Sequence, residues 1–120
     1  MFKTIDDVPT GVVAVTALGV IHAQDYETVL IPKIQAALEH TDKVSVLLHF
    51  GPEFGGYAFG AVWEDMVFGV SHWRAFRKIA VVSDVDWIRH AVGLFAPILP
   101  AQVKVFPNKA LHAAKDWITA

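Results

Sequence analysis

The stretch VSVLLHFGPEFGGYAFGAVWEDMVFGVSHWRAFRKIAVVS, residues 44–83, decides the fold of this 120-residue chain. It begins with a short apolar run, Val44–Phe50, which is typical of a strand covered on both faces. Glycines and a proline interrupt the pattern at residues 51–56, helical spacing follows over residues 57–72, and Lys78–Ser83 is a second apolar run. A strand, a helix and a strand in this order predict a parallel pair joined by a right-handed crossover.

The flanking sequence adds three strands and three helices to this unit. The strands are predicted at residues 2–7, 12–18 and 102–106. The helices are predicted at residues 22–40, 86–95 and 107–118. Pro32 lies inside the first helix, where the missing N–H predicts a bend over Thr28–Pro32. The sequence therefore predicts one α/β domain over residues 1–120, with a small, mixed, mainly parallel five-stranded sheet and four helices packed against it.

Composition excludes several classes of function. The chain is 54% hydrophobic and 18% charged, against roughly 45–50% and 25% for an average protein, so it is unusually apolar for its size. Its formal net charge is −2 and its ten lysines and arginines are scattered, so no basic stripe indicates a nucleic-acid partner. The absence of cysteine excludes disulfides, thiol catalysis and cysteine-ligated metals, and it is compatible with a reducing cytoplasm.

Hydropathy predicts a cytoplasmic protein that at most lies on a membrane surface. The N-terminal MFKTIDDVP carries two acidic residues where a signal peptide would have an apolar core. Polar residues interrupt every long apolar run before it reaches the ~18 residues of a spanning helix.

Together with the order of elements, several local strings resemble the SpoIIAA-like family, a branch of the STAS-domain group. They are Gly19–Gln35, Val44–Phe50 with its glycine loop, Trp63–Phe76, Lys78–Trp87 and Val103–Ile118. The resemblance implies a small mixed sheet with helices wrapped against it, and a family associated with apolar ligands and membrane contact. In STAS domains related to anti-sigma-factor antagonists, a partner kinase phosphorylates a serine at the start of the helix after the central strand. The corresponding stretch here, Phe54–Tyr57, has no Ser or Thr, so the phosphorylation switch is not expected.

The polar residues do not form a recognisable catalytic or metal-binding motif. No two of the six histidines are four residues apart, and Asp65 with His72 is the nearest approach to a helical metal pair. The carboxyl ends of the two central strands gather possible catalytic side chains, which are His49, Glu53, Ser83, Asp84 and Asp86. Helix capping explains Ser83 and Asp84 equally well, and no nucleophile elbow is present. We therefore predict no enzyme activity, no catalytic residue, no metal and no cofactor.

The aromatic residues after the glycine loop are the strongest functional signal. Paired Gly55 and Gly56 predict either a structural turn or a mobile hinge before the aromatic helix. On that helix Phe68 falls between Asp65 and His72, on the face expected to contact solvent. Part of the apolar surface must therefore be covered by a ligand, a partner or a membrane. The predicted ligand-binding residues are His49, Glu53, Phe54, Tyr57, Phe59, Trp63, Phe68 and His72.

Three functions remain open from the sequence. The first is a noncatalytic module that binds an apolar or amphipathic small molecule or lipid. The second is a protein-interaction or regulatory module, including a homodimer, in which the same apolar surface is an interface. The third is peripheral membrane contact. Its support is partial, because Glu64 and Asp65 lie beside the aromatic residues, whereas a helix at a membrane surface prefers lysine and arginine there.

Overall fold

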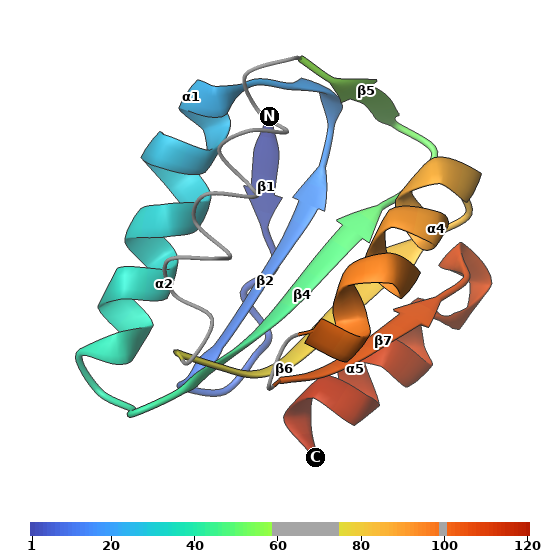
Figure 1. Ribbon diagram of the computed structural model, residues 1–120. Coiled ribbons are helices and arrows are strands. Elements are labelled where there is room, and N and C mark those ends of the chain that lie inside the picture. Colours follow the sequence, from blue (N-terminus) through green and yellow to red (C-terminus); the bar gives the residue numbers. More distant parts are fainter. Residues whose placement is uncertain (59–74, 99–100) are drawn as a thin grey trace.

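The structure is a computed structural model, and it describes residues 1–58, 75–98 and 101–120 (Figure 1). Its strands are β1 (Phe2–Thr4), β2 (Val12–Ala17), β3 (Gly19–Ile21), β4 (Val44–Phe50), β5 (Phe54–Tyr57), β6 (Phe76–Ser83) and β7 (Gln102–Phe106). Its α-helices are α1 (Ala23–Asp25), α2 (Ile31–Leu38), α4 (Asp86–Phe95) and α5 (Leu111–Thr119). A π-helical turn, Tyr26–Leu30, joins α1 to α2, and short 3-10 turns lie at Ala96–Ile98 and Asn108–Ala110.

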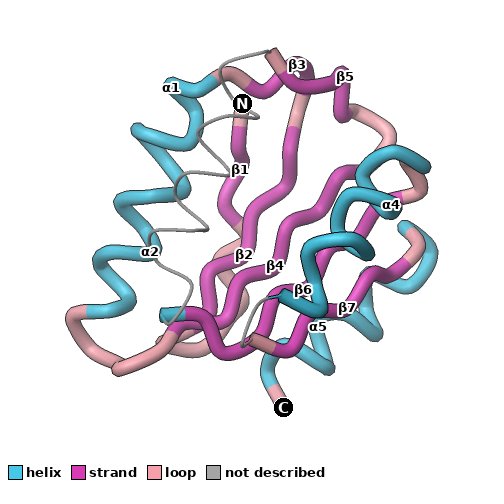
Figure 2. Tube along the Cα trace, viewed as in Figure 1, coloured by secondary structure: helices cyan, strands magenta, loops and turns pink. Residues whose placement is uncertain are grey.

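Five strands form one sheet in the order β1-β2-β4-β6-β7. β1 is antiparallel to β2, and the other neighbours are parallel. This confirms the predicted mixed, mainly parallel five-stranded sheet, whose strands Figure 2 shows side by side. Near the carboxyl ends of the four parallel strands, the register aligns one residue from each strand in a row. The residues of this row are Thr16, His49, Val82 and Phe106. Residues of one row point to the same face, because neighbouring strands share the pleat of the sheet.

Helices cover both faces of this sheet (Figure 1). The core on the face next to α1, α2 and α4 includes Val46, Phe50, Val81, Ile34 and Ile88. The core on the opposite face, under α5, includes Ala14, Leu47, Val82, Ala114 and Ile118. Strand β4 supplies both cores, because successive side chains of a strand point to opposite faces. This explains why its sequence reads as a continuous apolar run rather than as an alternating one.

The described ranges contain three helical segments where four helices were predicted. These segments are the continuous helix over residues 23–38, α4 and α5. The fourth, predicted over residues 57–72, lies outside the described residues from Phe59 onward. The bend predicted near Pro32 corresponds to the π-helical turn directly before α2, where the proline occupies one of the first positions of the helix. A proline is tolerated there because the wider turn no longer needs its missing N–H.

Strands β3 and β5 were not predicted. They form a separate parallel two-stranded sheet, which lies above the carboxyl ends of β2 and β4 (Figure 2). Tyr57 therefore ends a strand, and the prediction that it begins a helix is wrong. The backbones approach closely here, because a Cβ added at Gly55 would lie 3.0 Å from the carbonyl carbon of Gly19. Gly56 has φ of +115°, a conformation that only glycine adopts readily.

Candidate functional site

An aromatic cluster lies at the carboxyl edge of the sheet, where the β3–β5 pair meets α4 and the start of the first helix. We define it by Tyr26, Phe50, Phe54, Tyr57 and Trp87. Phe50 and Phe54 pack edge to face with ring centroids 5.0 Å apart, and Tyr57 lies 5.5 Å from Phe54. Trp87 approaches Tyr57 edge-on at 5.7 Å. Edge-to-face pairs at these distances contribute about 0.5–1.5 kcal/mol each beyond the area they bury.

Local sequence explains how these rings converge. Phe50 is the last residue of β4. The turn that follows, in which the Phe54 N–H donates to the Gly51 carbonyl at 3.1 Å, leads into β5, which pairs with β3. The pairing sets Tyr57 opposite Ile21, close to the beginning of the first helix. Trp87 comes from the other side, in the first turn of α4. The cluster therefore forms where three connections meet at one end of the sheet. They are the β4–β5 turn, the turn from β3 to α1 and the connection from β6 to α4.

A hydrogen bond between two tyrosines lies beneath the exposed part of the cluster. The Tyr26 hydroxyl donates to the Tyr57 hydroxyl at 3.0 Å, and their rings are stacked with centroids 6.4 Å apart. Tyr26 is 1% exposed, and its ring also meets Phe2 edge to face. A polar pair is thus held inside an apolar surround, which is the usual composition of a small-molecule site.

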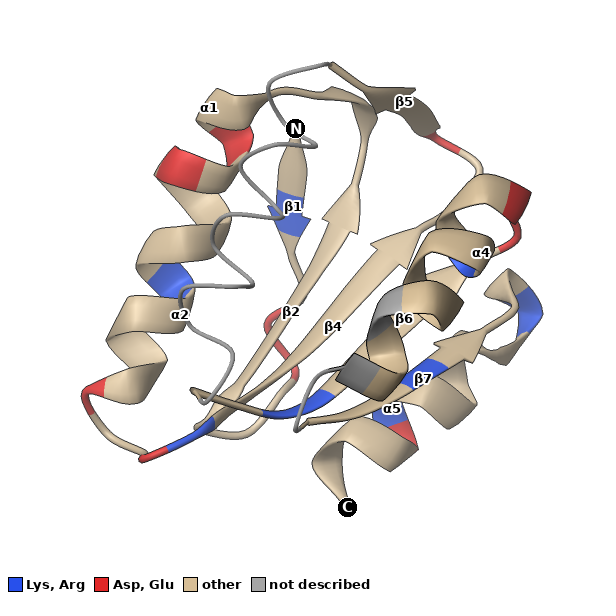
Figure 3. Ribbon diagram, viewed as in Figure 1, with Lys and Arg blue, Asp and Glu red and all other residues tan. Residues whose placement is uncertain are grey.

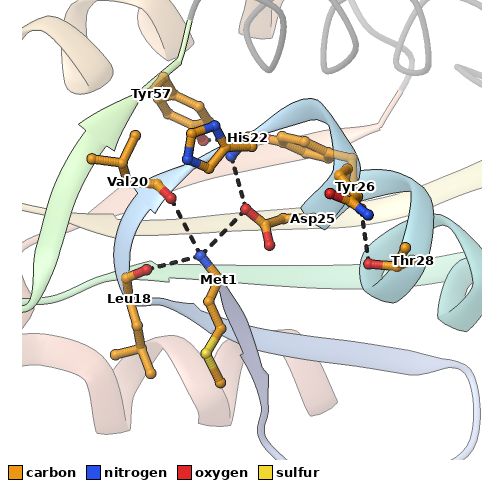
Figure 4. Close-up of polar contacts among 9 residues, drawn as sticks. Met1, Leu18, Val20, His22, Asp25, Tyr26, Thr28 and Tyr57 are labelled. Carbon is orange, nitrogen blue, oxygen red and sulfur yellow. Dashed lines mark hydrogen bonds and ion pairs between the residues drawn. The ribbon is translucent and has the colours of Figure 1, made fainter.

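Asp25 ties the start of the first helix to β3. Its carboxylate accepts the backbone N–H of His22 at 2.8 Å and lies 3.3 Å from the amino group of Met1 (Figure 4). The same amino group donates to the carbonyls of Leu18 at 2.9 Å and Val20 at 3.4 Å. These contacts hold the turn between β3 and α1 in place, and this turn positions the neighbouring Tyr26.

The outer side of the cluster is apolar and open to solvent. Trp87 is 49% exposed and Val20, on β3, is 46% exposed. Val20 and Tyr57 occupy alternate positions of the β3–β5 pair and so point to opposite faces of it, which leaves Trp87 as the exposed part of the cluster. A ligand or partner that covered Trp87 would gain the free energy of removing its surface from water.

The structure brings together only some of the predicted ligand-binding residues. Phe54 and Tyr57 belong to the aromatic cluster. Glu53 is exposed in the turn before β5, and its carbonyl accepts the N–H of Gly19 at 2.7 Å. The remaining aromatic and histidine predictions, Phe59, Trp63, Phe68 and His72, lie outside the described residues.

His49 lies on the opposite face of the sheet from the aromatic cluster. It shares a row with Thr16, whose hydroxyl is 3.2 Å from its Nδ1, and it faces α5. Burial, and then the positive charge of Lys115 on α5, lowers the pKa of His49 below its ordinary value of 6.5. Because Phe50 follows it in β4 and points to the other face, His49 does not join Phe54 and Tyr57.

Sequence reasoning missed Tyr26, Phe50 and Trp87. Tyr26 and Phe50 were assigned to helix and strand packing, which their burial bears out, although they also form the floor of the cluster. Trp87 offered a signal, because a large aromatic residue in the first turn of a helix that follows a buried strand lies at the carboxyl edge of the sheet.

The polar residues at the end of β6 have structural roles. The Ser83 hydroxyl accepts the N–H of Val85 at 3.0 Å, and the Asp84 carboxylate accepts the N–H of Asn108 at 3.0 Å. Both bonds hold the backbone ahead of a helical segment, but neither is a helix cap. The N-cap of α4 is Val85, which makes no side-chain cap bond, so the predicted capping role of Ser83 and Asp84 is wrong. Within the described ranges, no three His, Asp or Glu side chains are placed to hold a metal ion.

A shallow groove of about 300 Å³ lies between the β1–β2 loop and the end of the first helix, with Asp6, Lys33 and His40 among its lining residues. Lysines and arginines lie on separate elements rather than in one band (Figure 3). No helix in the described part of the chain is both long enough and apolar enough to cross a membrane.

Comparison with known proteins identifies relatives by family and by fold. A family model described as SpoIIAA-like matches residues 12–119. A solved structure, an uncharacterised protein of the DUF3478 family with a SpoIIAA-like fold from Shewanella loihica PV-4, superposes with a TM-score of 0.75. The two sequences are 22% identical, and the match covers 98% of this chain and 92% of that one. No curated protein matches the chain.

Proposed function

The chain belongs to the SpoIIAA-like family, and from this starting point we propose that it is a noncatalytic module that binds an apolar or amphipathic small molecule, such as a lipid. The observation that carries the proposal is the aromatic cluster at the carboxyl edge of the sheet. In open α/β sheets this edge is where ligands bind. The cluster presents Trp87 half exposed, while Tyr26 and Phe50 beneath it are fully buried.

The energetics favour an apolar ligand. An indole side chain offers about 250 Å² at most, so covering the 49% of Trp87 that is exposed would contribute about 2–3 kcal/mol to binding. The rings below are fixed by their mutual edge-to-face contacts, so little entropy is lost when a ligand settles against them.

Polar groups beside the rings suit an amphipathic ligand. The hydroxyl pair of Tyr26 and Tyr57 lies under the cluster, and the exposed carboxylate of Glu53 precedes β5. The Glu53 carboxylate can accept a hydrogen bond from a hydroxyl or amide head group, while an apolar tail lies along Trp87, above the buried tyrosine pair. A lipid with this chemistry would also allow the peripheral membrane contact that the composition suggests.

A protein-interaction module is the second candidate, and a specific observation favours it. Leu94 is 75% exposed and lies seven residues after Trp87, so the two share one face of α4. An exposed apolar stripe on a helix is the usual form of an interface rather than of a small pocket.

Titration with the neutral apolar dye Nile red, read by its fluorescence, distinguishes these candidates. For a ligand-binding module, Trp87→Ala should weaken dye binding at least several-fold, whereas the matched change Leu94→Ala on the same helix should leave it unchanged. Native mass spectrometry of the protein from its own host should then show an added lipid-like mass. A doubled mass that both substitutions reduce would favour the interface instead, and dye binding unchanged by Trp87→Ala would refute the ligand site.

Sedimentation with lipid vesicles tests the membrane component separately. If the exposed apolar residues contact the bilayer, protein should pellet with the vesicles and Trp87→Ala should reduce the bound fraction. Protein that remains in the supernatant at all vesicle concentrations would remove membrane contact from the proposal without affecting the Nile red result.

A further inference from the structure

A second group of polar side chains converges on the face of the sheet opposite the aromatic cluster. Thr16 on β2 and His49 on β4 are neighbours in one row, which Lys3 continues on β1, and Lys115 comes from α5. The Thr16 hydroxyl lies 3.2 Å from Nδ1 of His49. Helix α5 packs over β4 through Leu111, Ala114 and Ile118. Lys115 lies one helical turn after Leu111 and is half-buried, so it stands at the border of this packed face. We propose that Thr16, His49 and Lys115 form a binding site for a small oxyanion, independent of the aromatic cluster.

The charge balance of this group indicates an anionic ligand. Lys115 is half-buried, yet the ion pairs within the described residues join only Met1 to Asp25 and His112 to Asp116. The ammonium group of Lys115 therefore has no carboxylate partner in the described part of the chain. A cation that has lost part of its hydration is stabilised by an anion in direct contact, and here an anion would have to come from outside.

The histidine supplies a second, directed hydrogen-bonding group. Its Nδ1 is engaged by Thr16, while its Nε2 has no hydrogen-bond partner among the described residues. The ring is held against the backbone of Gly51, since a Cβ added there would lie 3.0 Å from Cε1 and 3.1 Å from Nε2. An alanine at this position would push the ring aside by a few tenths of an ångström, so glycine keeps the imidazole in its orientation.

Proton uptake should accompany anion binding. Burial and the charge of Lys115 lower the pKa of His49, so the free protein holds a neutral imidazole near neutral pH. The row of His49 also contains Lys3 on β1, the Thr16 hydroxyl on β2 and Val82 on β6. Of these only Lys3 is charged, and it adds positive charge to the same face. On α5, the His112 side chain is 92% exposed, and its Nε2 lies 3.8 Å from Oδ2 of Asp116 on the same helix. An oxyanion beside Lys115 would offset its charge and favour the protonated imidazole, so binding should tighten as the pH falls.

The proposal is tested by NMR titration of the His49 ring proton, assigned with His49→Gln, in sulfate, formate or chloride at equal ionic strength. Sulfate and formate are useful probes because neither titrates near neutral pH. An oxyanion site predicts that sulfate raises the pKa of His49 by about one, which corresponds to about tenfold tighter binding to the protonated form. A response to formate but not to sulfate would identify the ligand as a carboxylate, and the reverse as a phosphate-like group.

Two lysine variants provide the control. Lys115→Gln should abolish the sulfate response and, without anion, raise the pKa of His49. Lys109→Gln, at an exposed lysine just before α5, should change neither result. Thermal unfolding of both variants checks that they remain folded. An equal response to sulfate and chloride, or a full sulfate response in Lys115→Gln, would overturn the proposal.

Discussion

The hydrogen bond between Tyr26 and Tyr57 allows a sharp test of the aromatic cluster, because it can be removed without removing either ring. Tyr26→Phe and Tyr57→Phe each delete one hydroxyl and retain the stacked rings, whose centroids are 6.4 Å apart at an interplanar angle of 15°. The oxygens are 3.0 Å apart, a normal hydrogen-bond length. A bond of this kind contributes about 0.5–1.5 kcal/mol net to stability.

The double-mutant cycle isolates this contribution from the other contacts of each tyrosine. The free energy of unfolding is measured by urea denaturation for the wild type, both single variants and the double variant. If the bond is present, the double variant should lose about 0.5–1.5 kcal/mol less than the two single losses added together. Tyr57→Phe combined with Phe106→Leu, on the other face, serves as the control and should be additive to within about 0.5 kcal/mol. Additivity in the tyrosine cycle as well would mean that β5 does not hold Tyr57 against the first helix.

Three further predictions test the other features. Gly55→Ala should destabilise the protein by about 1–3 kcal/mol and weaken Nile red binding, because its methyl group meets backbone; Gly93→Ala, with open space around it, should be neutral or stabilising by up to about 1 kcal/mol. Because the folded state lowers the pKa of His49, the unfolded chain binds that proton more tightly, so the urea midpoint should fall as the pH drops below 6.5. His49→Gln should remove this part of the fall, and an unchanged pH profile would contradict it. Incubation with an anti-sigma-type kinase should leave the intact mass unchanged, since the chain has no Ser or Thr from residue 51 to residue 70; a stoichiometric phosphate on Tyr57, or on Ser83 with altered partner binding, would refute this.

The buried strands of the sheet could be predicted because their sequence carries the signal of their environment. β4 and β6 contain consecutive apolar residues, at 46–48 and 79–82, and a strand covered by helices on both faces is the usual source of this pattern. The edge strand β7 alternates Lys104 with Val103 and Val105, as one exposed face requires. Periodicity therefore identified the elements whose burial is regular.

The small β3–β5 sheet could not be predicted in the same way. Its strands are three and four residues long, which is too short to show a period. β5 contains Gly55 and Gly56, which disfavour a strand when considered alone. The pairing depends on the close backbone approach of Gly55 to Gly19, a contact between residues far apart in the sequence. Because Tyr57 was assigned to a helix, its contact with Trp87 could not be anticipated.

Strand β4 explains why the sequence grouped residues that the structure separates. The sequence shows which side chains follow the carboxyl end of a strand, and this predicts the edge of the sheet at which they lie. It does not show on which of the two faces they lie. His49 and Phe50 are adjacent, so the pleat directs one toward α5 and the other toward the aromatic cluster. One strand end thus supplies a titratable group to one face and an aromatic floor to the other. The two proposed sites share the backbone of β4 but not the same surface, so an apolar ligand and an oxyanion could bind at the same end of the sheet without competing.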